Sequence, residues 1–196
     1  SFYGPKVWHS TDKYKKVVYR CNNKYANEKC CTPVLTEEIL EQGFIRAVNK
    51  VFSLKAQLLE DCREMQEMLS DTSELEVNIK SKTEEAHVVS EMIRKIVEKN
   101  SRVAQDQAKF WEEYTSLENR YKALMSEVED LSYQRNARER KADIIGAFMF
   151  ELHEREEPIE EFNIRLWSIM IDTVIVRADK TLVYKFRNGT EVEEKI

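Results

Sequence analysis

The sequence holds very little glycine and proline, the residues that most often interrupt regular secondary structure. It has four Gly and three Pro in 196 residues, and none lies between Gly43 and Gly146. Because these residues mark turns and helix ends, their absence excludes a middle region built from short strands and tight turns. A content of 34% charged residues is, in addition, typical of long helices. We therefore expect a helical middle.

Long apolar runs are also absent. No run approaches the roughly 20 residues that a membrane-spanning helix needs, and no signal-peptide pattern is present. We expect no membrane partner. The chain also lacks an initiator Met and opens in mid-pattern with SFYGPKVW, so we interpret it as a fragment of a longer protein.

Recognisable catalytic patterns are missing as well. There is no Ser/His/acid set with supporting context and no glycine-rich phosphate loop, and the chain has three histidines. His87 and His153 fall at positions typical of ordinary surface histidines. The many carboxylates lie on solvent-facing helix positions, where partners four residues away explain them. We expect no enzyme activity in this chain by itself.

Charge is distributed unevenly along the chain, although the net value is only −5. Residues 1–30 hold seven cations and two anions, so the remaining residues hold 24 cations and 34 anions. A small basic module on an acidic body indicates a polyanionic partner for the N-terminal end. The alternative is a solvated, lysine-rich hairpin.

Two apolar tracts with a 3.5-residue repeat flank Asn100–Ser101. Such a repeat keeps a narrow seam turned toward a partner helix, so the pair predicts an antiparallel coiled-coil hairpin with its tip near 97–103. Each arm would reach about 40 Å at about 1.5 Å per residue. Lys82 and Asn100 place polar groups on the seam, which favours one register at some cost in stability. The apolar seam positions are Leu75, Ile79, Ala86, Val89, Ile93, Ile96, Phe110, Tyr114, Leu117, Tyr121, Leu124, Val128 and Leu131.

The remaining segments predict small β elements at both ends of the chain and helices between them. The fold class is therefore mainly α with small β elements (α+β): a compact head built from both termini, with the helical hairpin projecting from it. Thr36 followed by two glutamates is a good helix start. The expected elements are strands at 2–9 and 15–20, a helix at 36–69, a break at 70–73, a turn at 99–101, a short helix at 159–169 and two or three closing strands after it.

The cysteines permit two interpretations. Cys21, Cys30 and Cys31 cluster in the loop after the first strands, whereas Cys62 is alone on a helix and is expected in the core. Tetrahedral zinc in a ribbon needs two thiolate pairs, and this chain supplies one, Cys21 with either Cys30 or Cys31. A site completed by His9 is oddly spaced. The other interpretation is a set of reduced, buried cysteines.

The segments FYGPKVWHS, KKVVYRCNNKY, KCCTP and TEE, in this order, resemble the recombinase zinc β-ribbon of the large serine recombinases, the integrases and resolvases of mobile elements. That family has C-x-x-C-G immediately before its FYG segment. The resemblance implies that Cys21 and Cys30 are metal ligands and that Cys31 fills a variable position. The other two ligands would lie upstream, so zinc belongs to the full-length protein and is not expected to bind this fragment stably.

The resemblance covers the whole chain and implies a division of labour. A catalytic domain with the serine nucleophile would precede this piece. The ribbon would bind double-stranded attachment-site DNA in the major groove, and the coiled coil would contact other recombinase subunits during synapsis. The setting would be the cytoplasm of a bacterium, at the nucleoid. The basic residues expected to contact DNA are Lys6, Lys13, Lys15, Lys16, Arg20 and Lys24.

These expectations divide the chain into four parts: a ribbon at 1–35, a connecting helix at 36–71, a coiled-coil hairpin at 72–138, and returning helices with closing strands at 139–196. The competing hypothesis is a stand-alone coiled-coil adaptor or scaffold in which the basic hairpin is only a folding cap and DNA plays no role. A metal-dependent hydrolase is disfavoured, because no acid–base pair or open metal site is recognisable.

Overall fold

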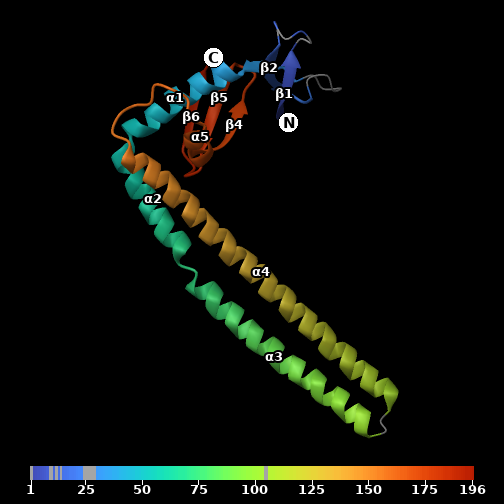
Figure 1. Ribbon diagram of the computed structural model, residues 1–196. Helices are drawn as coiled ribbons and strands as arrows, with labels where there is room; N and C mark the ends of the chain where they lie inside the picture. Colours follow the sequence, from blue (N-terminus) through green and yellow to red (C-terminus); the bar gives the residue numbers. More distant parts are fainter. Residues whose placement is uncertain (1, 9–10, 12, 14, 24–29, 104–105) are drawn as a thin grey trace. The chain divides into compact units, whose positions relative to one another are not determined.

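The computed structural model describes residues 2–8, 11, 13, 15–23, 30–103 and 106–196. It is mainly helical with two small antiparallel sheets, as the sequence predicts (Figure 1). The chain separates into two compact units. The first combines Ser1–Met65 with Ile144–Ile196, and the second is Gln66–Asp143.

The first sheet of the first unit is formed by the N-terminal strands. β1 (Tyr3–Trp8) pairs antiparallel with β2 (Lys16–Cys21), and β2 pairs with the two-residue β3 (Leu35–Thr36). The two predicted strands are therefore confirmed within a residue or two at each end. The third strand was not predicted, because a two-residue strand leaves no alternating pattern in the sequence.

The second sheet carries the core of the first unit. β4 (Ile171–Val176), β5 (Thr181–Phe186) and β6 (Glu191–Lys195) form an antiparallel meander, the three-strand form of the predicted closing strands. β5 is buried at five of its six positions, and its Tyr184 is fully buried. The Tyr184 hydroxyl donates a 2.8 Å hydrogen bond to the backbone carbonyl of Leu40, which ties the sheet to the neighbouring helix.

That helix, α1 (Glu37–Ser53), packs its apolar face on the sheet. Its buried residues include Phe44, Val48 and Val51. The predicted N-cap is confirmed, since the Thr36 hydroxyl accepts a hydrogen bond from the backbone N–H of Ile39. Such a cap satisfies one of the four unpaired N–H groups at a helix start.

An ionic contact joins α1 to the edge strand β6. Glu194 is only 6% exposed and lies 2.9 Å from Arg46 Nε and 2.6 Å from Lys50 Nζ. Burial raises the pKa of Glu194, but the hydrogen bonds from Lys50 and Arg46 outweigh it and hold this pKa below its ordinary value. The carboxylate is therefore charged at neutral pH and fastens β6 to α1.

The predicted continuous helix at 36–69 is wrong, because the structure has a break at Leu54. α1 ends at Ser53, and α2 runs over Lys55–Ser70. The Leu54 N–H turns back to the Val51 carbonyl at 3.0 Å, three residues earlier, and helical bonding resumes from Leu58 to Leu54. A tightened turn of this kind leaves no glycine or proline signal in the sequence.

The predicted helix at 159–169 is also wrong at its start. α5 is Ile164–Met170, capped by Asn163, whose side chain accepts from the Leu166 N–H at 3.0 Å. Before α5, the backbone N–H of Ile159 donates to the side-chain oxygen of Asn49 at 2.9 Å, and the Ile159 carbonyl accepts from the Asn49 amide nitrogen at 3.0 Å. The backbone groups of Ile159 are therefore hydrogen-bonded to a residue far away in the sequence, which helix propensity cannot predict.

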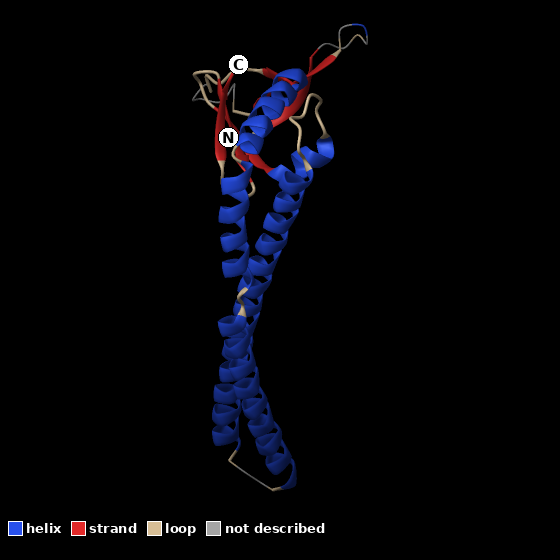
Figure 2. Cartoon of the chain, turned by 90° about the vertical axis from the view of Figure 1, so that its left-hand side faces the viewer, coloured by secondary structure: helices blue, strands red, loops and turns tan. Residues whose placement is uncertain are grey.

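The second unit is an antiparallel pair of helices. α3 (Ser73–Arg102) lies beside the first part of α4 (Gln107–Glu154), as Figures 1 and 2 show. Lys82 Nζ lies 2.8 Å from a Glu127 oxygen, and Gln107 donates to the Asn100 side chain at 3.1 Å. A residue later in α3 thus contacts a residue earlier in α4, so the two helices run antiparallel.

Every predicted seam position is buried or half-buried in this helical pair. Ala86, Val89 and Leu124 form a buried cluster, with Ile93, Leu117 and Tyr121 packed against it. The intervening positions are mostly exposed. The apolar faces of α3 and α4 therefore pack against each other.

The predicted turn at 99–101 is wrong by about two residues, because α3 continues to Arg102. The polar side chains that favoured a turn are accommodated in the helix: the Ser101 hydroxyl donates to the Glu98 carbonyl at 2.7 Å, and Asn100 accepts from Gln107.

Candidate nucleic-acid interface

The basic hairpin of the first unit places three of its cations on one side. Residues directly opposite in an antiparallel pair share a face. Lys6 lies opposite Val18, Gly4 opposite Arg20 and Trp8 opposite Lys16. The register therefore puts Lys6, Lys16 and Arg20 on the same face of the β1–β2 hairpin.

Two of the other predicted DNA contacts, Lys13 and Lys15, lie between β1 and β2. Lys13 and Lys15 are exposed, as are Lys6 and Lys16, whereas Arg20 is partly buried. Lys24 lies outside the described residues. Exposed ammonium groups on a two-stranded ribbon can contact phosphates while the ribbon lies in a groove. Such a ribbon is one of the shapes that a major groove admits.

The two predicted metal ligands line the same cavity, near Tyr3. Cys21, at the end of β2, is 2% exposed, and the Cys30 thiol lies 3.0 Å from the Thr32 hydroxyl. Burial is the main cause that raises the pKa of the Tyr3 phenol; the Thr32 hydroxyl opposes this effect and both thiols add to it. Tyr3 also donates a 2.6 Å hydrogen bond to the Pro33 carbonyl.

A cavity of about 550 Å³ adjoins these thiols and is lined in part by Cys21, Cys30 and Val174 of β4. Two thiols are the soft donors that zinc selects, but a structural zinc site takes four ligands. Among the described residues, no group of three or more His, Cys, Asp or Glu side chains has metal-binding geometry. In the described part of the chain, the Cys21 and Cys30 thiols alone would supply half of such a ligand set.

The remaining cysteines differ in their surroundings. Cys31 is exposed and Cys62 is 1% exposed. Burial raises the pKa of the Cys62 thiol, which accepts a weak hydrogen bond from the Asn188 amide at 3.7 Å. Cys62 is thus a core residue, as its place on a helix indicated. Sequence reasoning did not single out Thr32, because a hydroxyl contact to Cys30 follows no spacing rule.

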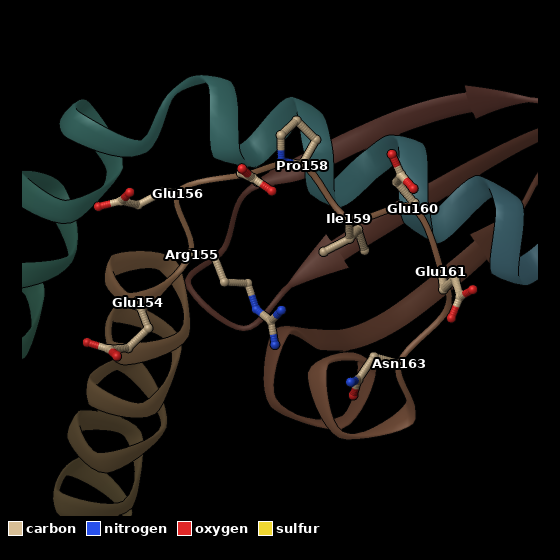
Figure 3. Close-up of a pocket in the computed structure, with 9 residues that line it drawn as sticks. Glu154, Arg155, Glu156, Pro158, Ile159, Glu160, Glu161 and Asn163 are labelled. Carbon is tan, nitrogen blue, oxygen red and sulfur yellow. The ribbon is translucent and has the colours of Figure 1, made fainter.

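An acidic loop of the same unit contrasts with the basic hairpin. Residues between 154 and 163 line a hollow of about 690 Å³, and five glutamates and one arginine are among them. Figure 3 shows Arg155 turned inward, with Glu154 and Glu156 turned away. Arg155 and Arg165 both pair with Glu151, which is only 9% exposed, at 3.3 and 3.7 Å. A loop of this charge repels phosphates.

No helix in the described parts of the chain combines the length and apolar character needed to cross a bilayer. Comparison of the chain with protein-family models, curated proteins and solved structures finds no match.

Proposed function

We propose that this chain is the non-catalytic DNA-binding and subunit-contact region of a serine site-specific DNA recombinase. The observation that carries the proposal is the face of the hairpin that bears Lys6, Lys16 and Arg20, in a chain whose first 30 residues are basic and whose remainder is acidic. The order of the ribbon segments in the sequence supports the choice of family. The catalytic serine would belong to another domain of the protein.

Within this proposal, Cys21 and Cys30 supply two of four thiolates of a structural zinc in the full-length protein. Zinc there would hold the base of the hairpin rigid, so that the cations keep a fixed spacing. The convergence of both thiols beside Tyr3 supports this role. The metal would take no part in any chemical step.

The helical pair of the second unit would act as a coiled-coil arm between subunits. Its seam is occupied by its own two helices, so contacts to another subunit fall on other faces. Large apolar side chains stand exposed there: Val77, Val88 and Met92 on α3 are 66%, 56% and 46% exposed, and Trp111 on α4 is 58% exposed. Burying such side chains favours association.

The DNA role is tested by titrating the full chain into a fluorescent mixed-sequence duplex at several salt concentrations. Affinity should fall steeply with salt, with a slope of about 0.9 per phosphate contact. Lys6→Ala/Lys16→Ala should lower that slope by about 2. The matched control, Lys80→Ala/Lys95→Ala, removes two exposed lysines from α3 and should leave the slope unchanged.

Two outcomes would overturn the proposal. Absence of binding to any duplex at low salt would favour the adaptor or scaffold hypothesis. Equal loss of slope in both double variants would mean that total charge, and not the hairpin face, attracts DNA.

A further inference from the structure

A small aromatic pocket lies in the first unit, on residues other than the basic face of the hairpin. Its volume is about 300 Å³, at the lower end of the roughly 300–1,000 Å³ found for ligand pockets. Three rings line it, those of Tyr19 from β2, Phe162 from the loop before α5, and Trp167 from α5. Glu37, Leu40 and Glu41 of α1 and Ile164 of α5 complete the lining. We call this site the aromatic pocket.

The indole of Trp167 is held in place from beneath the aromatic pocket. Its ring centroid lies 5.1 Å from that of Phe44, 5.9 Å from that of Phe162 and 6.2 Å from that of Tyr184. Phe44 and Tyr184 are fully buried. Because neighbouring rings already hold Trp167, binding a ligand against it costs little additional side-chain entropy.

The two carboxylates stand on one side of α1, because residues four apart in a helix are neighbours. Among the described residues, neither Glu37 nor Glu41 takes part in an ion pair or a side-chain hydrogen bond. Two further carboxylates, Glu160 and Glu161, immediately precede Phe162 in the chain (Figure 3). The charged side chains that line the aromatic pocket are therefore both acidic.

Rings and carboxylates together attract a cation. An aromatic face binds ammonium or guanidinium groups through its quadrupole, and a carboxylate adds a charge-assisted hydrogen bond. The same carboxylates repel phosphate, so nucleic acid does not fit. Guanidinium is flat and donates in a fork, which suits a site lined by both aromatic rings and carboxylates.

We propose that the aromatic pocket binds an arginine side chain presented by a basic segment of a protein partner. The volume admits one side chain. This site is independent of the proposed DNA role, because it shares no residue with the hairpin face that carries Lys6.

The test uses the full chain labelled with ¹⁵N and the blocked peptide Gly-Lys-Arg-Lys-Gly as probe. The indole N–H signal of Trp167 should shift on titration. A peptide with citrulline in place of arginine keeps the shape and loses the charge, and it should bind about tenfold more weakly. Glu37→Gln/Glu41→Gln should weaken binding of the arginine peptide about fivefold to tenfold.

Glu38→Gln is the matched control, since Glu38 is exposed on the same turn of α1 but does not line the aromatic pocket. It should leave binding unchanged. Glu37 and Glu38 are exposed and Glu41 is half-buried, and the amide spectrum of each variant verifies its fold. Equal binding of the citrulline peptide, equal loss in Glu38→Gln, or no shift at Trp167 would each overturn the proposal.

Discussion

Replacing Gly43 by alanine should destabilise the first unit, although alanine is the better helix former. A Cβ built at Gly43 meets the Tyr184 hydroxyl oxygen at a separation that real Cβ atoms do not adopt, and it lies 3.0 Å from the ring carbon Cζ. Tyr184 is fully buried and hydrogen-bonded to Leu40. The ring therefore has to move, or α1 has to lift from the sheet.

The magnitude follows from three contributions. Overpacking a core costs about 1–3 kcal/mol, and losing the Tyr184 hydrogen bond costs about 1 kcal/mol. Exchange of glycine for alanine inside a helix returns about 1 kcal/mol. The net loss for Gly43→Ala is therefore about 2 kcal/mol. Tyr184→Phe alone should cost about 1 kcal/mol, because it removes only the hydrogen bond.

The double variant distinguishes this explanation from general damage. Tyr184→Phe removes the atom that the new Cβ meets first, so Gly43→Ala/Tyr184→Phe should lose about 1–2 kcal/mol rather than the sum of about 3. Urea unfolding followed by Trp167 fluorescence measures this, in a background where Trp8 and Trp111 are phenylalanine. Trp167 reports on the right place, since its ring lies 6.2 Å from that of Tyr184.

The reasoning is refuted if Gly43→Ala is neutral or more stable than the parent chain. That result would mean that helix propensity alone governs the position and that α1 does not approach β5 closely. Additive losses in the double variant would likewise refute the contact between the two side chains.

Three further predictions concern other parts of the molecule. Leu124→Ala should cost about 3 kcal/mol in thermal unfolding followed by circular dichroism, because Leu124 is 5% exposed in the seam; Met125→Ala, 40% exposed beside it, should cost less than about 0.5 kcal/mol. The pKa of Glu194 is held below its ordinary 4.5, so its stabilising contribution is present above that pH and is lost as pH falls through the lowered value; urea unfolding at several pH values should show a shallower acid loss in Glu194→Gln. Iodoacetamide should alkylate exposed Cys31 well before buried Cys62, whose pKa is raised by burial; equal rates by mass spectrometry would contradict the burial of Cys62.

The helical pair was predictable because its information is local and repeated. Each seam residue, such as Ala86 or Leu124, recurs at the 3.5-residue spacing, and one misplaced residue does not hide the pattern. The break at Leu54 and the late start of α5 were not predictable. The break at Leu54 depends on a local backbone hydrogen bond to Val51. The segment before α5 is held by two hydrogen bonds between Asn49 and Ile159, which lie far apart in the sequence.

The candidate nucleic-acid interface was likewise predictable only in part. Alternation in β1 and β2 revealed two strands, but only the register shows that Lys6, Lys16 and Arg20 share a face. The aromatic pocket left no sequence signal, because Tyr19 and Trp167 belong to segments at opposite ends of the chain. In the sequence, Gly43 is only a residue with low helix propensity. The structure explains why glycine fits there, because Tyr184, far away in the sequence, leaves no room for a Cβ.

The discontinuous first unit has a consequence for how the chain folds. Its two segments are separated by the whole of Gln66–Asp143, and closing so long a loop from a flexible chain carries an entropic cost. The ends of the inserted segment already meet, since the Gln66 side chain donates to the Ala142 carbonyl at 3.3 Å. Helical hairpins form early because their contacts are local in sequence. We therefore expect the second unit to fold first and to shorten the loop that the first unit has to close.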